Sequence, residues 1–293
     1  MKDIGIISII LVTVAITACA QEKDVDVYLI GGQSNATGQG YMANLPEGFQ
    51  PDTNVLIFHS GKPALDSGAE PFCWHKLKQA SESPDRFGPE LGFGNQIQRL
   101  NQTRKIALIK HAKSDTDLFS QWNPGNSATD TLNQGEEFRM FVKTVNAGLD
   151  SLKRKGFNPI IRGMIWQQGE GDADHEKGIH SAEYAQNLSH FISRVREQFA
   201  SPNMLFVYGF VYPPRGNEQT QPRINVRNGQ AAVDENSGSA FATEGARIVK
   251  TDDLNHRADD PNTPYTWDHI HFGTQGILQL GIRMAEKMNE LKK

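Results

Sequence analysis

Strand-like and helix-like segments alternate along the whole chain, and this alternation restricts the possible folds more than any other feature. Apolar runs rich in β-branched residues are typical of strands, and apolar residues at helical spacing are typical of amphipathic helices. The strand-like runs are residues 25–30, 55–58, 105–110, 159–166, 204–211 and 246–250. The helix-like segments are residues 91–100, 135–155, 181–199, 224–236 and 274–291. This order predicts an α/β fold with a central parallel sheet and helices on both faces.

Composition fits one soluble globular domain. The chain has 293 residues, of which 38% are hydrophobic and 22% are charged. A length of this size is compatible with one large α/β domain, which we predict over residues 24–293. The net charge of −4 gives no reason to expect nucleic acid as a partner. No repeat or low-complexity tract interrupts the chain.

The first 20 residues have the pattern of an export signal. Lys2 precedes an apolar run over residues 4–16, and small residues follow at 17–20. This run is short for a membrane span and typical of a secretory signal. Cleavage after Ala20 fits ordinary signal peptidase, whereas residues 16–19 resemble a bacterial lipobox that would lipidate Cys19, and we favour the second slightly. We therefore expect a periplasmic, extracellular or lipid-anchored bacterial protein, with membrane contact only through such an anchor.

A serine follows the first strand-like run directly. The run over residues 25–30 ends at Gly31 and Gly32, and Ser34 comes next, between Gln33 and Asn35. Glycines let the backbone turn sharply, and ligands in open α/β sheets bind at the carboxyl ends of strands. Ser34 is therefore a candidate nucleophile, although the same residues also suit an ordinary turn.

A base and an acid for this serine stand near the C-terminus. A serine hydroxyl needs a base within hydrogen-bond reach and an acid that orients the base. Asp268 and His271 are three residues apart in a predicted turn before the last helix, and His269 is the rival base. A metal site built on His269 and His271 with Asp172, Asp174 and His175 is the alternative reading.

Acyl transfer also requires donors for the developing oxyanion. The Ser34 backbone N–H is one candidate, and the Gly88 N–H at a loop-to-helix junction is a second. The Gln168 side-chain amide, at the end of the fourth strand-like run, is a third.

Four motifs in order resemble the conserved blocks of the SGNH hydrolases, in their sialate O-acetylesterase-like branch. They are residues 32–35 (Gly-Gln-Ser-Asn), 88–93 (Gly-Pro-Glu-Leu-Gly-Phe), 166–173 (Trp-Gln-Gln-Gly-Glu-Gly-Asp-Ala) and the pair Asp268 and His271. This branch includes the acetyl xylan esterases of carbohydrate esterase family six. The motifs span nearly the whole mature chain, and a chance match of all four is improbable.

The resemblance implies a flavodoxin-like, three-layer α/β/α sandwich and a serine esterase that removes acetyl groups from O-acetylated oligo- or polysaccharides. Ser34 would attack the ester, His271 would move the proton and Asp268 would orient His271. Ser34, Gly88 and Gln168 would form the oxyanion hole, and no cofactor or metal is implied. Trp122, Asn35 and Glu170 are predicted to bind substrate, and Glu170 competes with Asp268 as the acid partner of His271.

Two other functions stay open at this point. One is a metal-dependent hydrolase, and the other is a non-catalytic carbohydrate-binding surface protein whose aromatic loops form the site. The glycan that carries the acetyl group and the oligomeric state have no readable signal, because the loops at residues 41–53, 60–86 and 112–134 have no recognisable pattern.

Overall fold

The computed structural model describes residues 23–174, 176, 178–212 and 219–292. The predicted export signal at residues 1–20 and its Cys19 lie outside the described residues, as does His175. Within the described part of the chain, no helix has the length and apolar character that crossing a bilayer requires.

The central sheet has seven strands in the order β4-β3-β6-β1-β7-β8-β9, and every pairing is parallel except that of the short edge strand β4 with β3. This confirms the predicted α/β fold with a central parallel sheet. A separate two-stranded antiparallel sheet is formed by β2 and β5. The strands are β1 (Lys23–Gly32), β2 (Gly40–Tyr41), β3 (Leu56–His59), β4 (His75–Lys76), β5 (Arg86–Phe87), β6 (Lys105–Lys110), β7 (Phe157–Gln167), β8 (Leu205–Gly209) and β9 (Ala246–Val249).

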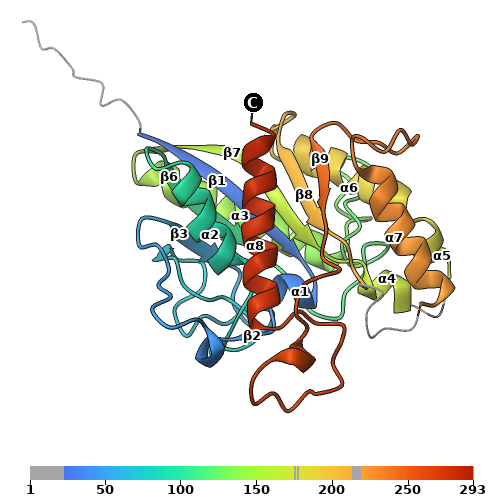
Figure 1. Cartoon of the computed structure of the whole chain (residues 1–293). Helices are drawn as coiled ribbons and strands as arrows, with labels where there is room; N and C mark the ends of the chain where they lie inside the picture. Colours follow the sequence, from blue (N-terminus) through green and yellow to red (C-terminus); the bar gives the residue numbers. More distant parts are fainter. Residues whose placement is uncertain (1–22, 175, 177, 213–218, 293) are drawn as a thin grey trace, which may run out of the picture.

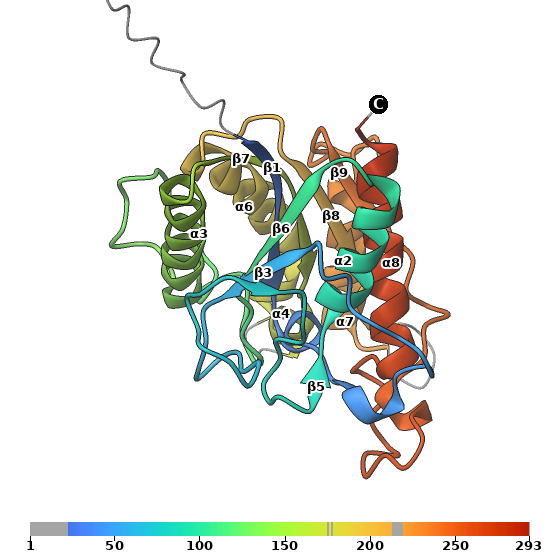
Figure 2. The same ribbon diagram turned by 90° about the vertical axis from the view of Figure 1, so that its left-hand side faces the viewer.

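Helices cover both faces of the sheet, so the molecule has three layers. Figure 2 shows α2 and α8 on one side of the sheet and α3 and α6 on the other. The helices are α1 (Ser34–Thr37), α2 (Pro89–Leu100), α3 (Glu136–Arg154), α4 (Glu170–Asp174), α5 (Ile179–Ala182), α6 (Tyr184–Gln198), α7 (Gln221–Val233) and α8 (Thr274–Glu290), with 3₁₀ turns at Met42–Asn44 and Arg257–Asp259. The helix predicted over residues 181–199 is in fact divided between α5 and α6.

The first strand joins the two halves of the core because both of its faces are buried. Successive side chains of a strand point to opposite faces. Val27 and Leu29 pack into the cluster under α3 and α6, and Tyr28 and Ile30 pack into the cluster under α2 and α8. This explains why residues 25–30 form a continuous apolar run without polar alternation.

The strand order places a ligand crevice beside β1. With β4 and β3 set aside as strands added at one edge, the order β6-β1-β7-β8-β9 is the 2-1-3-4-5 order of flavodoxin. In that order, ligand binds where the strand order reverses, at the carboxyl ends of the strands. Here that point lies between β1 and β7. The segments that follow β1, β6 and β7 therefore meet at one edge of the sheet (Figure 1).

A buried ion pair supports α1 from below. The Lys110 ammonium and the Glu90 carboxylate, both fully buried, lie 2.6 Å apart. The Lys110 Nζ also donates to the Thr37 carbonyl at the end of α1, at 3.0 Å. A buried charge must be paired, and this pairing connects β6, α2 and the helix that begins at Ser34.

Candidate active site

The turn after β1 presents Ser34 at the carboxyl edge of the sheet. Gly32 has a positive φ of 131°, and a Cβ at this position would lie 2.2 Å from the Gln167 carbonyl oxygen. Only glycine is compatible with both conditions. The chain then enters α1, whose first residue is Ser34, as predicted for a serine raised above the end of the strand.

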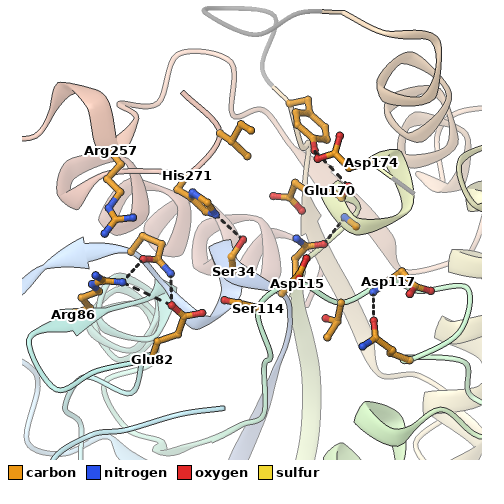
Figure 3. A pocket seen from close by; sticks show the side chains of 17 residues that line it. Ser34, Glu82, Arg86, Ser114, Asp115, Asp117, Glu170, Asp174, Arg257 and His271 are labelled. Carbon is orange, nitrogen blue, oxygen red and sulfur yellow. Dashed lines mark hydrogen bonds and ion pairs between the residues drawn. The ribbon is translucent and has the colours of Figure 1, made fainter. Parts of the chain in front are cut away.

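Ser34, His271 and Asp268 form a continuous hydrogen-bonded chain (Figure 3 shows its Ser34–His271 part). The His271 Nε2 lies 3.0 Å from the Ser34 Oγ, and the His271 Nδ1 lies 2.8 Å from the Asp268 Oδ2. The backbone N–H groups of Ile270 and His271 donate to the other Asp268 oxygen at 3.2 and 3.0 Å. Residues 268–271 therefore form a tight turn around the Asp268 carboxylate.

The charge of Asp268 fixes the tautomer of the histidine. Burial alone would raise the pKa of Asp268, but the hydrogen bond and the charge of His271, together with two backbone N–H donors, lower it to about 2. The ionised carboxylate accepts from His271 Nδ1–H, which leaves Nε2 as an acceptor facing the Ser34 hydroxyl. The alternative base, His269, does not line the pocket, and its ring lies beside that of His256.

Glu170 is not the acid partner of His271. Its Oε1 accepts from the Asn35 Nδ2 at 2.7 Å, and burial raises the pKa of this carboxyl. Glu170 does line the pocket, as predicted for a substrate-binding residue. Asn35, by contrast, does not line the pocket. It is buried, and its Oδ1 accepts a hydrogen bond from the Phe272 N–H at 2.9 Å. Asn35 therefore joins α1 to the turn that carries His271, which corrects its predicted contact with substrate.

The structure also corrects the predicted oxyanion roles of Gly88 and Gln168. The Gly88 N–H donates to the Glu90 Oε1 at 2.9 Å, and Gly88 is not among the residues that line the pocket. Gln168 is fully buried, and its Nε2 donates to the Asp172 Oδ2 at 2.6 Å. Both groups are already satisfied inside the protein, so neither can reach an oxyanion above Ser34.

Trp122 is likewise part of the core and not of the sugar site. Its side chain is fully buried and packs edge-on against Trp166, with ring centroids 5.0 Å apart. Its Nε1–H donates to the Thr116 Oγ1 at 3.0 Å. Trp122 therefore fixes the loop after β6 from inside, because a buried indole N–H requires a partner.

The loop after β6, part of the segment at residues 112–134 that has no recognisable sequence pattern, forms a wall of the site. The pocket has a volume of about 630 Å³, and residues 114–117 form one side of it (Figure 3). Asp115 has a positive φ of 60°, an uncommon conformation for a residue other than glycine. Because β6 is the direct neighbour of β1, this loop lies beside the turn that carries Ser34. The remaining pocket residues include Gln33, Gln39, Glu82, Arg86, Asp174, Tyr212 and Arg257.

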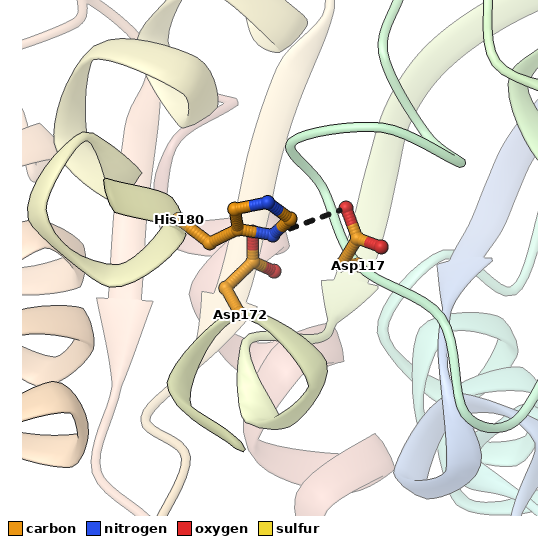
Figure 4. Close-up of side chains that lie close together, drawn as sticks. All are labelled: Asp117, Asp172 and His180. Carbon is orange, nitrogen blue, oxygen red and sulfur yellow. Dashed lines mark ion pairs between the residues drawn. The ribbon is translucent and has the colours of Figure 1, made fainter. Parts of the chain in front are cut away.

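The metal-site residues predicted from sequence do not converge in the described structure. His271 is bonded to Asp268, and Asp174 accepts from the Tyr212 hydroxyl. Asp172 instead lies near Asp117 and His180, with ligand atoms within 4.8 Å of one another (Figure 4).

The Asp172 carboxylate in that cluster holds protein groups together. It accepts the backbone N–H groups of Leu118 and Phe119 at 2.9 and 3.2 Å, besides the Gln168 amide. Burial raises its pKa to about 7. The cluster therefore joins the loop after β6 to α4.

A second serine–histidine contact lies outside the Ser34 pocket. The Ser60 Oγ is 2.7 Å from the His111 Nδ1, and the His111 Nε2 is 2.8 Å from a carboxylate oxygen of Glu137. Ser60 and His111 directly follow β3 and β6, and both are buried. Their contacts tie the ends of two neighbouring strands to the first turn of α3.

The α/β fold and the strand end that carries Ser34 are compatible with the class of carboxylic ester hydrolases, which the family match establishes. The chain belongs to the family described as "carbohydrate esterase, sialic acid-specific acetylesterase", whose model matches residues 24–290. The family gives the activity, hydrolysis of O-acetyl esters on carbohydrates, and confirms the predicted resemblance. No curated protein sequence matches the chain at a significant level.

Solved structures of similar shape agree with this fold. A protein from Arabidopsis thaliana has a TM-score of 0.65 at 16% identity, over 91% of this chain and 98% of that one. NanS has a TM-score of 0.63 at 14% identity, and the match covers 92% of this chain and 98% of NanS. XAC1771, a carbohydrate acetylesterase from Xanthomonas citri, has a TM-score of 0.56 at 17% identity, over 91% of this chain and 56% of its own. At these identities the likeness shows the fold alone.

Proposed function

We propose that the protein is a serine esterase that removes acetyl groups from O-acetylated glycans through Ser34, His271 and Asp268. The observation that carries the proposal is the hydrogen-bonded chain from Ser34 Oγ through both nitrogens of His271 to Asp268. A weak hydroxyl nucleophile becomes reactive when a neutral imidazole can take its proton and a carboxylate stabilises the resulting cation.

The reaction would proceed in two halves. The Ser34 oxygen bonds to the acetyl carbon while its proton passes to His271 Nε2, and the carbonyl electron pair moves onto oxygen. The tetrahedral species collapses as the bond to the sugar oxygen breaks, and His271 gives that oxygen its proton. Water then repeats the sequence on the acetyl-serine and releases acetate. The Ser34 N–H, at the start of α1 where backbone donors lack helical partners, is suited to hold the oxyanion.

We propose a neutral acetylated glycan, of the xylan type, in preference to an anionic sugar such as sialic acid. Besides the buried Glu170, the pocket wall carries four carboxyl groups, on Glu82, Asp115, Asp117 and Asp174, against two guanidinium groups. Both arginines are already near internal partners, Arg86 at 3.7 Å from Glu82 and Arg257 at 3.6 Å from Asp268. An excess of negative charge in a concave site disfavours an anionic ligand.

Export across a bacterial membrane remains part of the proposal. It is supported by the residue pattern at positions 1–20, including the lipobox-like segment that ends at Cys19. A polymeric glycan is an extracellular substrate, which agrees with that location.

Acetate release from acetylated xylo-oligosaccharides tests the mechanism. We expect the Ser34→Ala variant to lose activity by about 10⁴-fold or more, because the nucleophile of a triad cannot be replaced. The assay should include a chelator, which we expect to leave the wild-type rate unchanged. An active Ser34→Ala variant, or a rate abolished by the chelator, would contradict the serine mechanism.

A further inference from the structure

Gln33, the residue before Ser34, has a side chain whose orientation is fixed by its surroundings. It lines the Ser34 pocket but is only 4% exposed. Its Oε1 lies 2.9 Å from the Gly171 N–H, 3.5 Å from the Gly169 N–H and 3.2 Å from the Gln168 Nε2. All three neighbours are donors, so the carboxamide atom that faces them has to be the oxygen.

The Gln33 Nε2 consequently faces the other way. Among the residues that the structure describes, no acceptor pairs with this nitrogen, and it is not one of the fully buried polar atoms without a partner. The nitrogen therefore reaches the surface of the pocket, one residue from the nucleophile. An amide N–H held in this way is costly to leave unpaired unless a ligand or water meets it.

We propose that the Gln33 Nε2 donates a hydrogen bond to the oxyanion that forms when Ser34 attacks the acetyl carbonyl. The inference rests on the proposed serine mechanism. It gives Gln33 the amide role that the sequence analysis assigned to Gln168. Gln168 becomes a positioning residue, since its own Nε2 helps to hold the Gln33 oxygen and the Asp172 carboxylate.

The effect should appear in kcat more than in KM. The negative charge on the carbonyl oxygen is full only in the tetrahedral species, so a donor aimed at it stabilises the transition state more than the bound ester. A structural role for Gln33 would need only its oxygen, which holds the loop at residues 168–171. The two roles therefore use different atoms of one side chain.

The Gln33→Glu variant separates these roles. It keeps an acceptor oxygen for the Gly171 N–H and replaces the donor with a second oxygen. We expect kcat for acetate release to fall about 10²- to 10³-fold, with KM and the thermal midpoint near wild-type values. Gln33→Met, which removes both the donor and the acceptor oxygen without adding charge, should lose activity at least to a comparable degree. Gln186→Glu, the same change on the exposed side of α6, is the matched control and should leave kcat unchanged.

The outcomes distinguish this inference from the proposed function. If either Gln33 variant keeps kcat within about threefold of wild type while Ser34→Ala is inactive, the oxyanion role of Gln33 is wrong and the nucleophile stands. The role is equally wrong if activity falls only in proportion to a loss of folded protein, measured by circular dichroism on the same samples. An active Ser34→Ala variant would overturn the proposed function itself.

Discussion

The Asp115 carboxylate belongs to the pocket wall, and none of the other described residues forms a hydrogen bond or ion pair with it. Its backbone has a left-handed φ of 60°, which asparagine tolerates well. Asp115→Asn should therefore change the charge of the pocket with little effect on its shape.

This residue allows the preference for neutral sugars to be tested. We expect wild-type enzyme to release acetate from the methyl ester of 9-O-acetyl sialic acid at least about fivefold faster, in kcat/KM, than from the free acid. Asp115→Asn should narrow that difference by about two- to fivefold, because one exposed charge near the ligand is removed. Asp150→Asn, the same change on the exposed side of α3, is the control and should leave the difference between the two substrates unchanged. Equal or faster release from the free acid by the wild type would contradict the proposed neutral substrate.

For single residues, the sequence predicted which residue types belong to the site better than it predicted where their side chains point. The contact among Ser34, His271 and Asp268 could be predicted because these residue types have distinctive neighbours in the sequence. The sequence could not show which amide side chain faces the pocket. The orientation of Gln33 depends on donors at residues 168–171, more than 130 positions away. Trp122 was misassigned because an indole in a loop has the same sequence signature in a core and in a sugar site.

At the scale of elements, two helices cross closely because glycine lies at their contact. A Cβ on Gly92 in α2 would lie 2.2 Å from the Leu278 carbonyl oxygen, and one on Gly281 in α8 would lie 2.3 Å from the Pro89 carbonyl oxygen. These neighbours are backbone atoms, which cannot move aside without shifting a helix. The helix α2 begins one residue after Gly88, and α8 begins shortly after His271, so this contact also orients two segments near the site.

We therefore expect Gly92→Ala to destabilise the protein by roughly 1–3 kcal/mol, although alanine favours a helix by about 1 kcal/mol over glycine. The measurement is the free energy of unfolding in urea. Gly148→Ala in α3 is the matched control, since the nearest neighbours of its Cβ would be side-chain atoms of Ile109 and Phe58 and not backbone. It should change stability by less than about 1 kcal/mol. A Gly92→Ala variant as stable as wild type would show that the two helices have room to separate.

The elements themselves followed from local pattern, whereas their adjacency did not. The runs at residues 105–110 and 274–291 correspond closely to β6 and α8 because strand and helix periodicity is a local property. The position of β6 between β3 and β1 depends on pairing between distant segments. This pairing brings the loop after β6 beside Ser34, whereas the predicted oxyanion role of Gly88 came from its place at a helix start and from the family resemblance.

At the scale of the whole molecule, the architecture concentrates chemistry at one edge of the sheet. The carboxyl ends of β1, β6 and β7 supply Ser34, the wall at residues 114–117 and the loop that fixes Gln33. The turn before α8 adds His271 and Asp268 from the far end of the chain. A parallel sheet allows this convergence because all its strands end on the same side.

The most direct test of this account is to trap the nucleophile. A fluorophosphonate reacts with an activated serine, and peptide mapping by mass spectrometry identifies the serine that carries the adduct. We predict one adduct per chain, on Ser34, formed in step with the loss of acetate release and absent from Ser34→Ala. An adduct on another serine, with Ser60 beside His111 as the obvious rival, or full inactivation without modification of Ser34, would contradict the assignment of the active site.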